Sequence, residues 1–231
     1  MRLFSSRRQS LKAIKGLAKI SIVCESRGID KKFKAVFCLT RDGYGSIEGF
    51  GPFSTTLFKL VYNSKRLFLY LPREKTVYTA ENNAETLCKI LYFEWETVYL
   101  IDYLSANFPF DLSRAKTIAV STQNEDFIMR GESSARKWIA RLSDAGVPDI
   151  QKFCWLDKKG QCLTDISYTY DKEMGGYRLP VHIHFNQRND NAAMTIRLLS
   201  VKVNEPVNEK DFIPPDEWLE ENTILKKVPL S

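Results

Sequence analysis

The chain has 231 residues, of which 44% are hydrophobic and 12% aromatic, which is enough for one large β-sandwich or barrel with a sizeable core. No apolar run approaches the roughly 18 residues that span a bilayer. The net charge is +6, and residues 1–80 hold 16 Lys and Arg against 5 Asp and Glu. Such a basic part is compatible with an anionic membrane surface or nucleic acid, although a solvated outer face of a sheet is the simpler interpretation.

The start of the chain, residues 1–19, is too basic for a signal peptide, so we expect a cytoplasmic protein or a mature domain whose export signal has been removed. The helical spacing of Leu11, Ile14 and Leu17 predicts a short helix over residues 10–17. From residue 18 apolar and polar side chains alternate at the distances of an antiparallel meander. The strands predicted here cover residues 18–25, 31–41, 46–50, 57–62, 67–71 and 76–79.

A helical pair interrupts this meander. Asn82 or Asn83 is a suitable N-cap, and apolar side chains follow at helical spacing as far as Leu91. A second helix is predicted over residues 94–105, and Pro109 lies just beyond its end.

The strand pattern resumes after residue 111. Three segments there are weak: the second could be a loop and the third a helical turn. We therefore predict a mainly β, α+β fold with about ten to eleven antiparallel strands in a single sheet that curls around its apolar face, with the helices covering it. The weak segments are 117–122, 126–130 and 135–142, and clearer strands are predicted over 150–156, 162–170, 178–187 and 194–203.

The five cysteines include no CxxC pair and are odd in number, which argues against a disulfide framework. Four of them lie in apolar stretches, where a free cysteine usually behaves as a small core residue. These are Cys24, Cys38, Cys88 and Cys154.

The residues that usually carry catalysis do not form a recognisable set. His182 and His184 project from one face of a predicted strand, which is compatible with a metal pair, but a third ligand is not evident. No Gly-rich phosphate loop and no nucleic-acid-binding motif occurs. We therefore expect a protein that is not an enzyme and has no metal, no cofactor and no nucleic acid partner; an enzyme with an unrecognised site is an alternative.

Two stretches carry a resemblance to a known family. Residues 51–57 (Gly-Pro-Phe-Ser-Thr-Thr-Leu) and residues 78–87 (Tyr-Thr-Ala-Glu-Asn-Asn-Ala-Glu-Thr-Leu) resemble the strand–loop–strand segment and the lid entry of the LolA/LolB family of outer-membrane lipoprotein carriers and receptors. The resemblance implies a half-open antiparallel β-barrel with an inserted helical lid over residues 1–203. Residues 204–231 then form a Pro-containing tail that is expected to pack on one barrel end.

The resemblance also implies site residues. Pro52 and Phe53 would form a loop that contacts the membrane, although a Phe folded back onto the core is the simpler interpretation of that ring. Ordinary core is likewise the simpler interpretation of the lid positions. The implied cavity-lining residues are Phe33, Phe37, Leu39, Phe58, Leu60 and Leu69, and the implied lid residues are Leu87, Leu91, Val98, Ile101 and Leu104.

The function implied is non-enzymatic binding of lipid acyl chains, for sorting or insertion of lipoproteins at the bacterial outer membrane. The expected partners are lipoprotein acyl chains or another lipid, the membrane surface and a periplasmic carrier protein. The expected location is the periplasm or the periplasmic side of the outer membrane, given an export signal outside this sequence. The alternative is an envelope sensor or interaction protein that uses the same fold to bind a protein partner.

Overall fold

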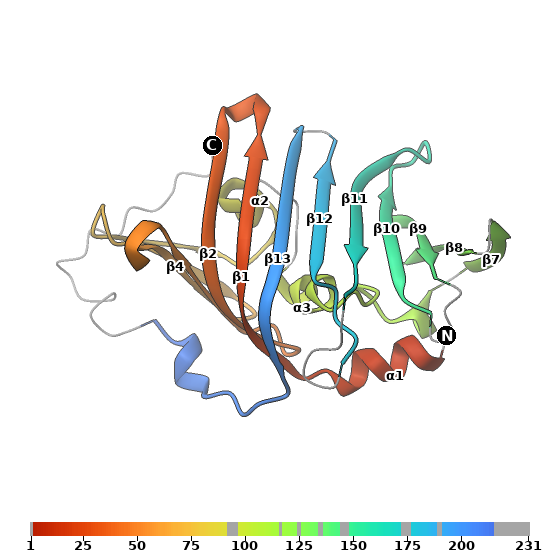
Figure 1. Cartoon of the computed structure of the whole chain (residues 1–231), viewed down its shortest axis with the longest axis horizontal. Helices are drawn as coiled ribbons and strands as arrows, with labels where there is room; N and C mark the ends of the chain where they lie inside the picture. Colours follow the sequence, from red (N-terminus) through yellow and green to blue (C-terminus); the bar gives the residue numbers. More distant parts are fainter. Residues whose placement is uncertain are drawn as a thin grey trace. The chain divides into compact units, whose positions relative to one another are not determined.

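The structure is a computed structural model that describes residues 2–91, 97–115, 117–123, 126–133, 136–143, 148–171, 177–188 and 191–214. Within these residues thirteen strands form one antiparallel sheet in the order β6-β5-β4-β3-β2-β1-β13-β12-β11-β10-β9-β8-β7 (Figure 1). All neighbours are consecutive in sequence except β1 and β13. The strands β6 and β7 remain as edges, so the sheet is not closed.

The strands are β1 (Ala13–Cys24), β2 (Ile29–Thr40), β3 (Gly45–Phe50), β4 (Thr56–Tyr62), β5 (Arg66–Leu71), β6 (Thr76–Glu81), β7 (Thr117–Gln123), β8 (Asp126–Ser133), β9 (Arg136–Leu142), β10 (Ile150–Leu156), β11 (Cys162–Thr169), β12 (His182–Gln187) and β13 (Ala192–Val203). The helices are α1 (Arg2–Ser10), α2 (Ala84–Leu91) and α3 (Leu100–Leu104).

The three weak segments after residue 111 are all strands, which corrects the predicted count of ten to eleven. The third of these segments, β9, buries Trp138, Ala140 and Leu142, and these alternate with more exposed residues. It pairs along its length with both β8 and β10. This period of two is visible in the sequence, but the basic residues between the apolar ones also allow a helical turn.

The helix predicted over residues 10–17 is wrong. Helix α1 ends at Ser10, and β1 begins at Ala13 between β2 and β13. Gly16 explains part of this, because a Cβ there would lie 2.8 Å from the ring of Phe37 on β2. The aromatic ring therefore fills the space over the glycine, a contact that only an extended segment beside β2 provides.

The helical insert begins where the sequence predicts. Asn83 is the N-cap of α2, since its Oδ1 accepts a hydrogen bond from the backbone N–H of Thr86 at 2.8 Å. Of the second predicted helix, residues 97–99 form a 3-10 turn and α3 follows. Residues 92–96 lie outside the described residues. The role of this insert as a lid stays a prediction.

The described chain divides into two compact units that interleave in sequence. Unit 1 holds Met1–Ser10, Ser21–Lys31 and Asp102–Arg197. Unit 2 holds Leu11–Ile20, Lys32–Ile101 and Leu198–Ser231.

The core of unit 1 is a register row with one buried residue from each of six neighbouring strands. Helix α3 packs on it through Tyr103, whose ring meets that of Phe185 edge to face at 6.0 Å and whose hydroxyl accepts a hydrogen bond from the indole of Trp155. Helix α1 adds Phe4, which packs edge to face on Phe108 at 5.2 Å. The row consists of Met129, Ala140, Phe153, Ile166, Phe185 and Met194.

Two buried carboxylates hold α1 in unit 1. Arg8 lies 3.2 Å from the carboxylate of Asp102 on α3, and Arg7 lies 3.2 Å from that of Asp149. Arg178 also reaches Asp149, at 2.5 Å. Only Leu3 and Phe4 within the helix are apolar, so periodicity does not reveal it, and its long-range partners explain why it forms.

The described part of the C-terminal tail packs on unit 2. Phe212 is buried against Val61 and Val77, and Val207 and Cys38 lie beside this cluster. Val61 and Cys38 share a face through their partner Ser46, because directly paired residues lie on the same side of a sheet. Residues 215–231 lie outside the described part of the chain.

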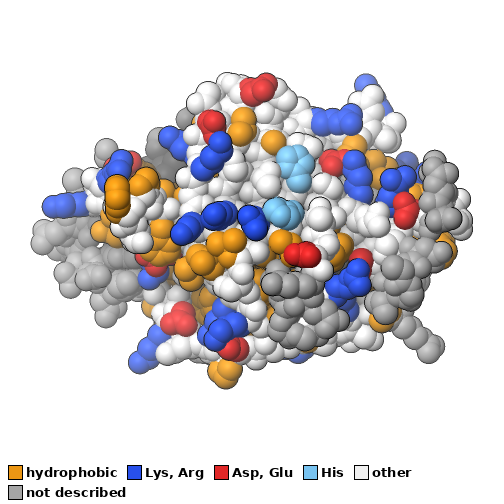
Figure 2. All heavy atoms as spheres, in the orientation of Figure 1, with side chains coloured by type: hydrophobic (Ala, Val, Ile, Leu, Met, Phe, Trp, Pro, Cys, Tyr) orange, Lys and Arg blue, Asp and Glu red, His pale blue; other side chains and the backbone are white. Residues whose placement is uncertain are grey.

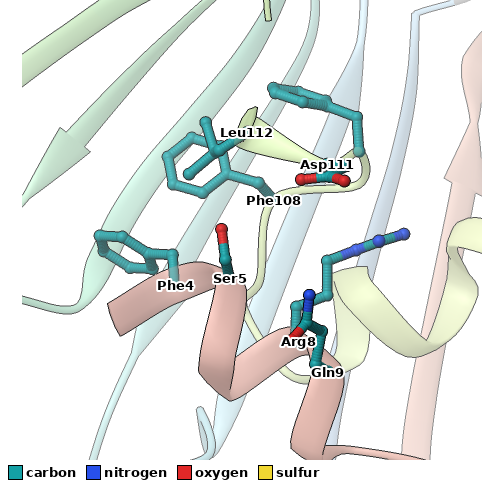
Figure 3. A pocket seen from close by; sticks show the side chains of 8 residues that line it. Phe4, Ser5, Arg8, Gln9, Phe108, Asp111 and Leu112 are labelled. Atoms are coloured by element: carbon teal, nitrogen blue, oxygen red, sulfur yellow. The ribbon is translucent and has the colours of Figure 1, made fainter. Parts of the chain in front are cut away.

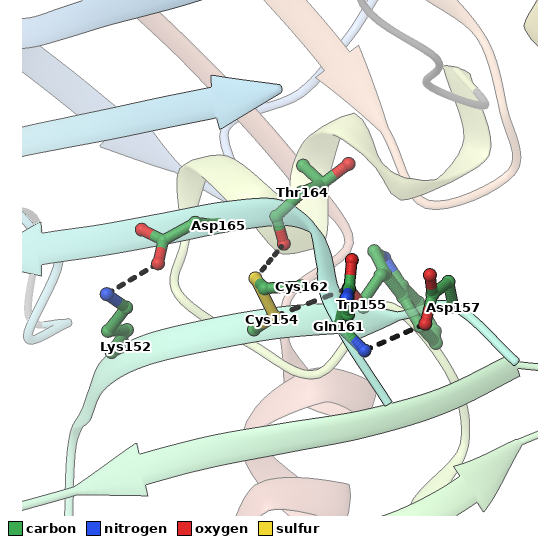
Figure 4. Close-up of a disulfide and its surroundings, with 8 residues drawn as sticks. All are labelled: Lys152, Cys154, Trp155, Asp157, Gln161, Cys162, Thr164 and Asp165. Carbon is green, nitrogen blue, oxygen red and sulfur yellow. Dashed lines mark hydrogen bonds and ion pairs between the residues drawn. A yellow bond between two sulfur atoms is a disulfide. The ribbon is translucent and has the colours of Figure 1, made fainter. Parts of the chain in front are cut away.

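The cysteine pattern argues against disulfides, but this prediction is wrong for two of the five cysteines. Cys154 and Cys162 form a disulfide across the β10–β11 hairpin, with Cα atoms 6.0 Å apart (Figure 4). The turn between them is fixed by Asp157, whose carboxylate accepts hydrogen bonds from the backbone N–H groups of Lys159 and Gln161. The hairpin register therefore brings the two sulfurs together, which no spacing motif reveals.

Candidate functional site

One face of unit 2 is apolar across five neighbouring strands. Phe37 on β2 pairs with Ile47, Ile47 with Leu60, and Leu60 with Leu69. Alternation places the rest of the predicted cavity residues on the same side. We call this surface the apolar face; its members are Phe33, Phe37, Leu39, Ile47, Phe58, Leu60, Leu69 and Tyr78.

All six residues predicted to line a cavity belong to the apolar face, although their role as a lining stays a prediction. Sequence reasoning missed Ile47 and Tyr78. Tyr78 pairs directly with Leu69 on β5. Both residues could have been found from the register of the predicted hairpins. A residue on the apolar face of one strand is paired with a residue on the same face of the next strand.

Burial on the apolar face is graded along the strands. Leu39 and Leu60 are buried, whereas Phe33 and Phe58 are half-buried. The two half-buried rings meet edge to face, with centroids 5.5 Å apart. Aromatic pairs favour this geometry. The face therefore has a closed end and an end where two aromatic rings remain partly accessible.

Glycines make room for the aromatic rings on this face. A Cβ at Gly49 would lie 2.3 Å from the ring of its partner Phe58. A Cβ at Gly45 would lie 2.2 Å from the ring of its partner Tyr62. Each ring thus lies over the glycine of the neighbouring strand. The ring occupies the space that a side chain at the glycine position would need.

The predicted membrane loop lies at the accessible end. Gly51 to Thr55 connects β3 to β4 directly beyond the Phe50–Thr56 pair, next to Phe33 and Phe58. Phe53 is fully exposed, with a relative accessibility of 103%, and Pro52 is exposed as well. Phe53 also has a positive φ of 56°, which a residue with a side chain adopts at a cost. The exposure of the ring shows that it does not fold back onto the core.

The predicted lid residues differ in their surroundings. Leu87 and Ile101 are buried, Leu104 is half-buried, and Val98 is 38% exposed. The side chain of Leu91 lies outside the described residues. Asn82 ties the insert to unit 2, since its amide donates to Thr97 Oγ1 at 2.7 Å and to the backbone carbonyl of Asn63.

Three cavities are lined by described residues of unit 1, and the six predicted cavity residues line none of these three. The first has a volume of about 30 Å³, room for about one water molecule. It lies between α1 and the segment after α3 (Figure 3). Its lining consists of Phe4, Ser5, Arg8, Gln9, Phe108, Phe110, Asp111 and Leu112.

Of the two larger cavities of unit 1, the smaller one lies on the side of the sheet opposite the core row, whereas Tyr168 on the core side also lines the larger one. Their volumes are about 490 and 330 Å³, and both include Arg141 and Lys152 in their lining. In the larger one, burial raises the pKa of Tyr170, whose hydroxyl donates to the carbonyl of Ile150. Charged side chains line both cavities, which differs from the purely hydrocarbon lining expected for an acyl chain.

The two histidines project from β12 on one side, as the sequence predicts, and Figure 2 shows them next to each other on the surface. The Nδ1 atom of His184 lies 3.0 Å from the hydroxyl of Thr195 on β13. Among the described residues, no group of three or more His, Cys, Asp or Glu side chains could hold a metal ion.

No family model matches the chain, and no curated protein matches it. Solved structures do match, over nearly their whole length. A DUF1329 family protein from Desulfovibrio piger aligns with a TM-score of 0.66 at 10% identity, covering 92% of this chain and 95% of its own. A LolA superfamily protein from Nitrosomonas europaea gives 0.63 at 7% identity, covering 92% and 96%.

A third structure, an outer membrane lipoprotein-sorting protein domain from Vibrio parahaemolyticus, gives a TM-score of 0.60 at 12% identity and covers 90% and 94% of the two chains. The chain has the LolA-like fold. The resemblance that residues 51–57 and 78–87 indicate is thereby confirmed at the level of the fold. In this LolA-like chain no described helix is long and apolar enough to cross a membrane.

Proposed function

We propose that this LolA-like protein binds lipid acyl chains on the apolar face of unit 2, without catalysing a reaction, and that it serves lipoprotein sorting or insertion at the bacterial outer membrane. The observation that carries the proposal is the half-buried Phe33–Phe58 pair, which opens the apolar face beside the exposed Phe53 loop. Similarity to a lipoprotein-sorting domain and to a LolA superfamily protein supports the same assignment.

The driving force for such binding is ample. Burying an acyl chain contributes about 0.8 kcal/mol per methylene, so even a partly covered chain gains several kcal/mol on an apolar surface. Unit 1 offers less, because Phe108, Phe110 and Trp138 already pack together on its core row. The half-buried rings of Phe33 and Phe58 in unit 2 still have accessible surface that a lipid chain can cover.

Transfer of a lipoprotein needs a difference in affinity between donor and acceptor rather than maximal affinity. An exposed aromatic ring next to the apolar face suits this role. Phe53 on the proposed membrane loop would enter the interfacial region of a bilayer, where aromatic rings are favoured, and bring the accessible end of the face to the lipid. The buried lid residues Leu87 and Ile101 would supply the apolar cover.

An envelope location is part of this proposal. The Cys154–Cys162 disulfide supports it, since disulfides persist in oxidising compartments such as the periplasm and are rare in the cytosol. A periplasmic carrier protein and the membrane surface are the partners that the proposed role requires.

Calorimetric titration with a synthetic tri-acylated lipopeptide tests the function. We expect saturable binding of the acylated form at micromolar concentration or below, and no binding of the same peptide without its acyl chains. The heat capacity change should be negative, because apolar surface is buried. Equal binding of both peptides would show that the peptide rather than the lipid is recognised, and would refute the proposal.

A further inference from the structure

The face of unit 1 opposite its core carries a second, very different surface. Arg130 on β8 pairs with Ile139, and Ile139 pairs with Cys154, which pairs with Asp165 on β11. The neighbouring outward row runs from Ile128 through Arg141 to Lys152. Because directly paired residues share one side of a sheet, these two rows form one continuous outer surface.

This surface is hollowed into a cavity of about 330 Å³. Four cationic side chains and one carboxylate line it, together with an apolar floor that includes Ile128, Ile139 and Leu156 and the disulfide described above. Figure 4 shows the disulfide near the turn end of the β10–β11 hairpin, with the Lys152–Asp165 ion pair further along the same strands. We call this cavity the basic groove; its charged lining is Arg130, Arg141, Lys152, Arg188 and Asp165.

The described ion pairs neutralise only part of this charge. Lys152 pairs with Asp165 at 2.5 Å, and Arg141 pairs with Asp126 at 3.3 Å. Among the ion pairs between described residues, none includes Arg130 or Arg188. Arg130 and Arg188 therefore line the groove without an ion pair to another described residue, so the groove carries excess positive charge.

We propose that the basic groove binds the phosphate group of an amphiphilic anion. Guanidinium groups bind phosphate oxygens in a planar two-pronged geometry, and the apolar floor accommodates the aliphatic part next to the phosphate. The groove adjoins the cavity of about 490 Å³, because Arg141 and Lys152 line both. The ligand is a phosphate ester carried by a bilayer lipid or by a soluble molecule.

This site is separate from the acyl-binding face, because it lies in unit 1 and uses charge rather than apolar contact. Its failure and that of the proposed function are therefore distinguishable. The test compares the whole chain with the double variant Arg130→Gln/Arg188→Gln. Its matched control is Arg66→Gln/Arg73→Gln, which removes two exposed cations of unit 2. The control and the double variant therefore have the same net charge.

The readout is co-sedimentation with vesicles of phosphatidylglycerol and phosphatidylcholine, or of phosphatidylcholine alone, and calorimetric titration with glycerol 3-phosphate. We expect the double variant to lose about 30-fold in affinity, at about 1 kcal/mol per cation, and the control to change less than threefold. Loss confined to anionic vesicles identifies a lipid headgroup, and loss confined to glycerol 3-phosphate a soluble ester. Absence of binding to both probes, or equal losses in variant and control, would overturn the proposal.

Discussion

The ring of Phe33 meets the ring of Phe58 edge to face, with centroids 5.5 Å apart, at the accessible end of the apolar face. Phe58 lies across Gly49 on the neighbouring strand, where a Cβ would come within 2.3 Å of its ring. Both rings are only half-buried. The pair therefore combines a fixed position with accessible apolar surface, the two properties that a lipid-binding aromatic needs.

Replacement of Phe58 by Ala removes this pair. We expect the affinity for a tri-acylated lipopeptide to fall about tenfold, because an edge-to-face partner and its apolar area contribute of the order of 1–2 kcal/mol. The cost in stability should be similar in size, since the ring is half-buried. The control is Val36→Ala, which shortens an apolar side chain that is 48% exposed on the other side of β2. Equal affinities for Phe58→Ala and Val36→Ala would contradict the assignment.

Phe53 can be tested without disturbing the fold. Phe53→Gly removes the exposed ring and suits the positive φ of 56°, so the free energy of unfolding should stay the same or rise by about 0.5 kcal/mol. We expect liposome association and cargo transfer to decrease in Phe53→Gly and to be lost in Phe53→Glu. The control Val120→Glu places a charge at a residue that is 60% exposed on β7. Unchanged liposome association in both Phe53 variants would exclude the loop from membrane contact.

The ion pair between Arg8 and Asp102, which holds α1 in unit 1, should contribute to the free energy of unfolding. Arg8→Ala leaves the fully buried carboxylate of Asp102 without this cation, and we expect a loss of about 3 kcal/mol in the free energy of unfolding. Arg114→Ala breaks a pair with Asp111 that is largely exposed, so it should cost less than about 0.5 kcal/mol. Urea denaturation followed by circular dichroism measures both, and a loss below 1 kcal/mol in Arg8→Ala would show that α1 is not held in this way.

Phe212 is buried against Val61 and Val77 on the side of the sheet opposite the apolar face, next to Cys38. Burial raises the pKa of the Cys38 thiol, Lys15 lowers it and Asp211 raises it. Phe212→Ala exposes the thiol, so its pKa should fall toward the ordinary value and more thiolate should be present at pH 8. We expect alkylation of Cys38 by iodoacetamide, followed by peptide mass spectrometry, to accelerate several-fold. Ile213→Ala, a change at a residue that is 59% exposed, should leave the rate unchanged.

Local patterns predict much of this fold. The hairpins from β2 to β6 follow from alternation and turn residues, and Asn83 caps α2 as one of the two residues predicted for that role. The failures have long-range causes. Helix α1 depends on buried carboxylates that lie 142 and 94 residues further along the chain, and β1 depends on the Phe37 ring over Gly16. Neither contact leaves a signal in the local pattern.

The candidate site divides in the same way. Alternation along single strands identifies six of the eight residues of the apolar face, and the rest follow only from the register between strands. The basic groove could not be predicted, because Arg130, Arg141, Lys152 and Arg188 come from different strands and loops and share no spacing. The disulfide in its floor could not be predicted either, because the hairpin register brings its two cysteines together.

Photo-crosslinking with a lipopeptide that carries diazirine groups along its acyl chains tests the central claim most directly. Bound acyl chains should label peptides of β2, β4 and β5, with adducts at or beside Phe33, Phe58 and Leu69, and unlabelled tri-acylated lipopeptide should compete the labelling away. Labelling that is absent, that is not competed, or that is confined to the outer surface of unit 1 would contradict the claim that the apolar face of unit 2 holds the lipid.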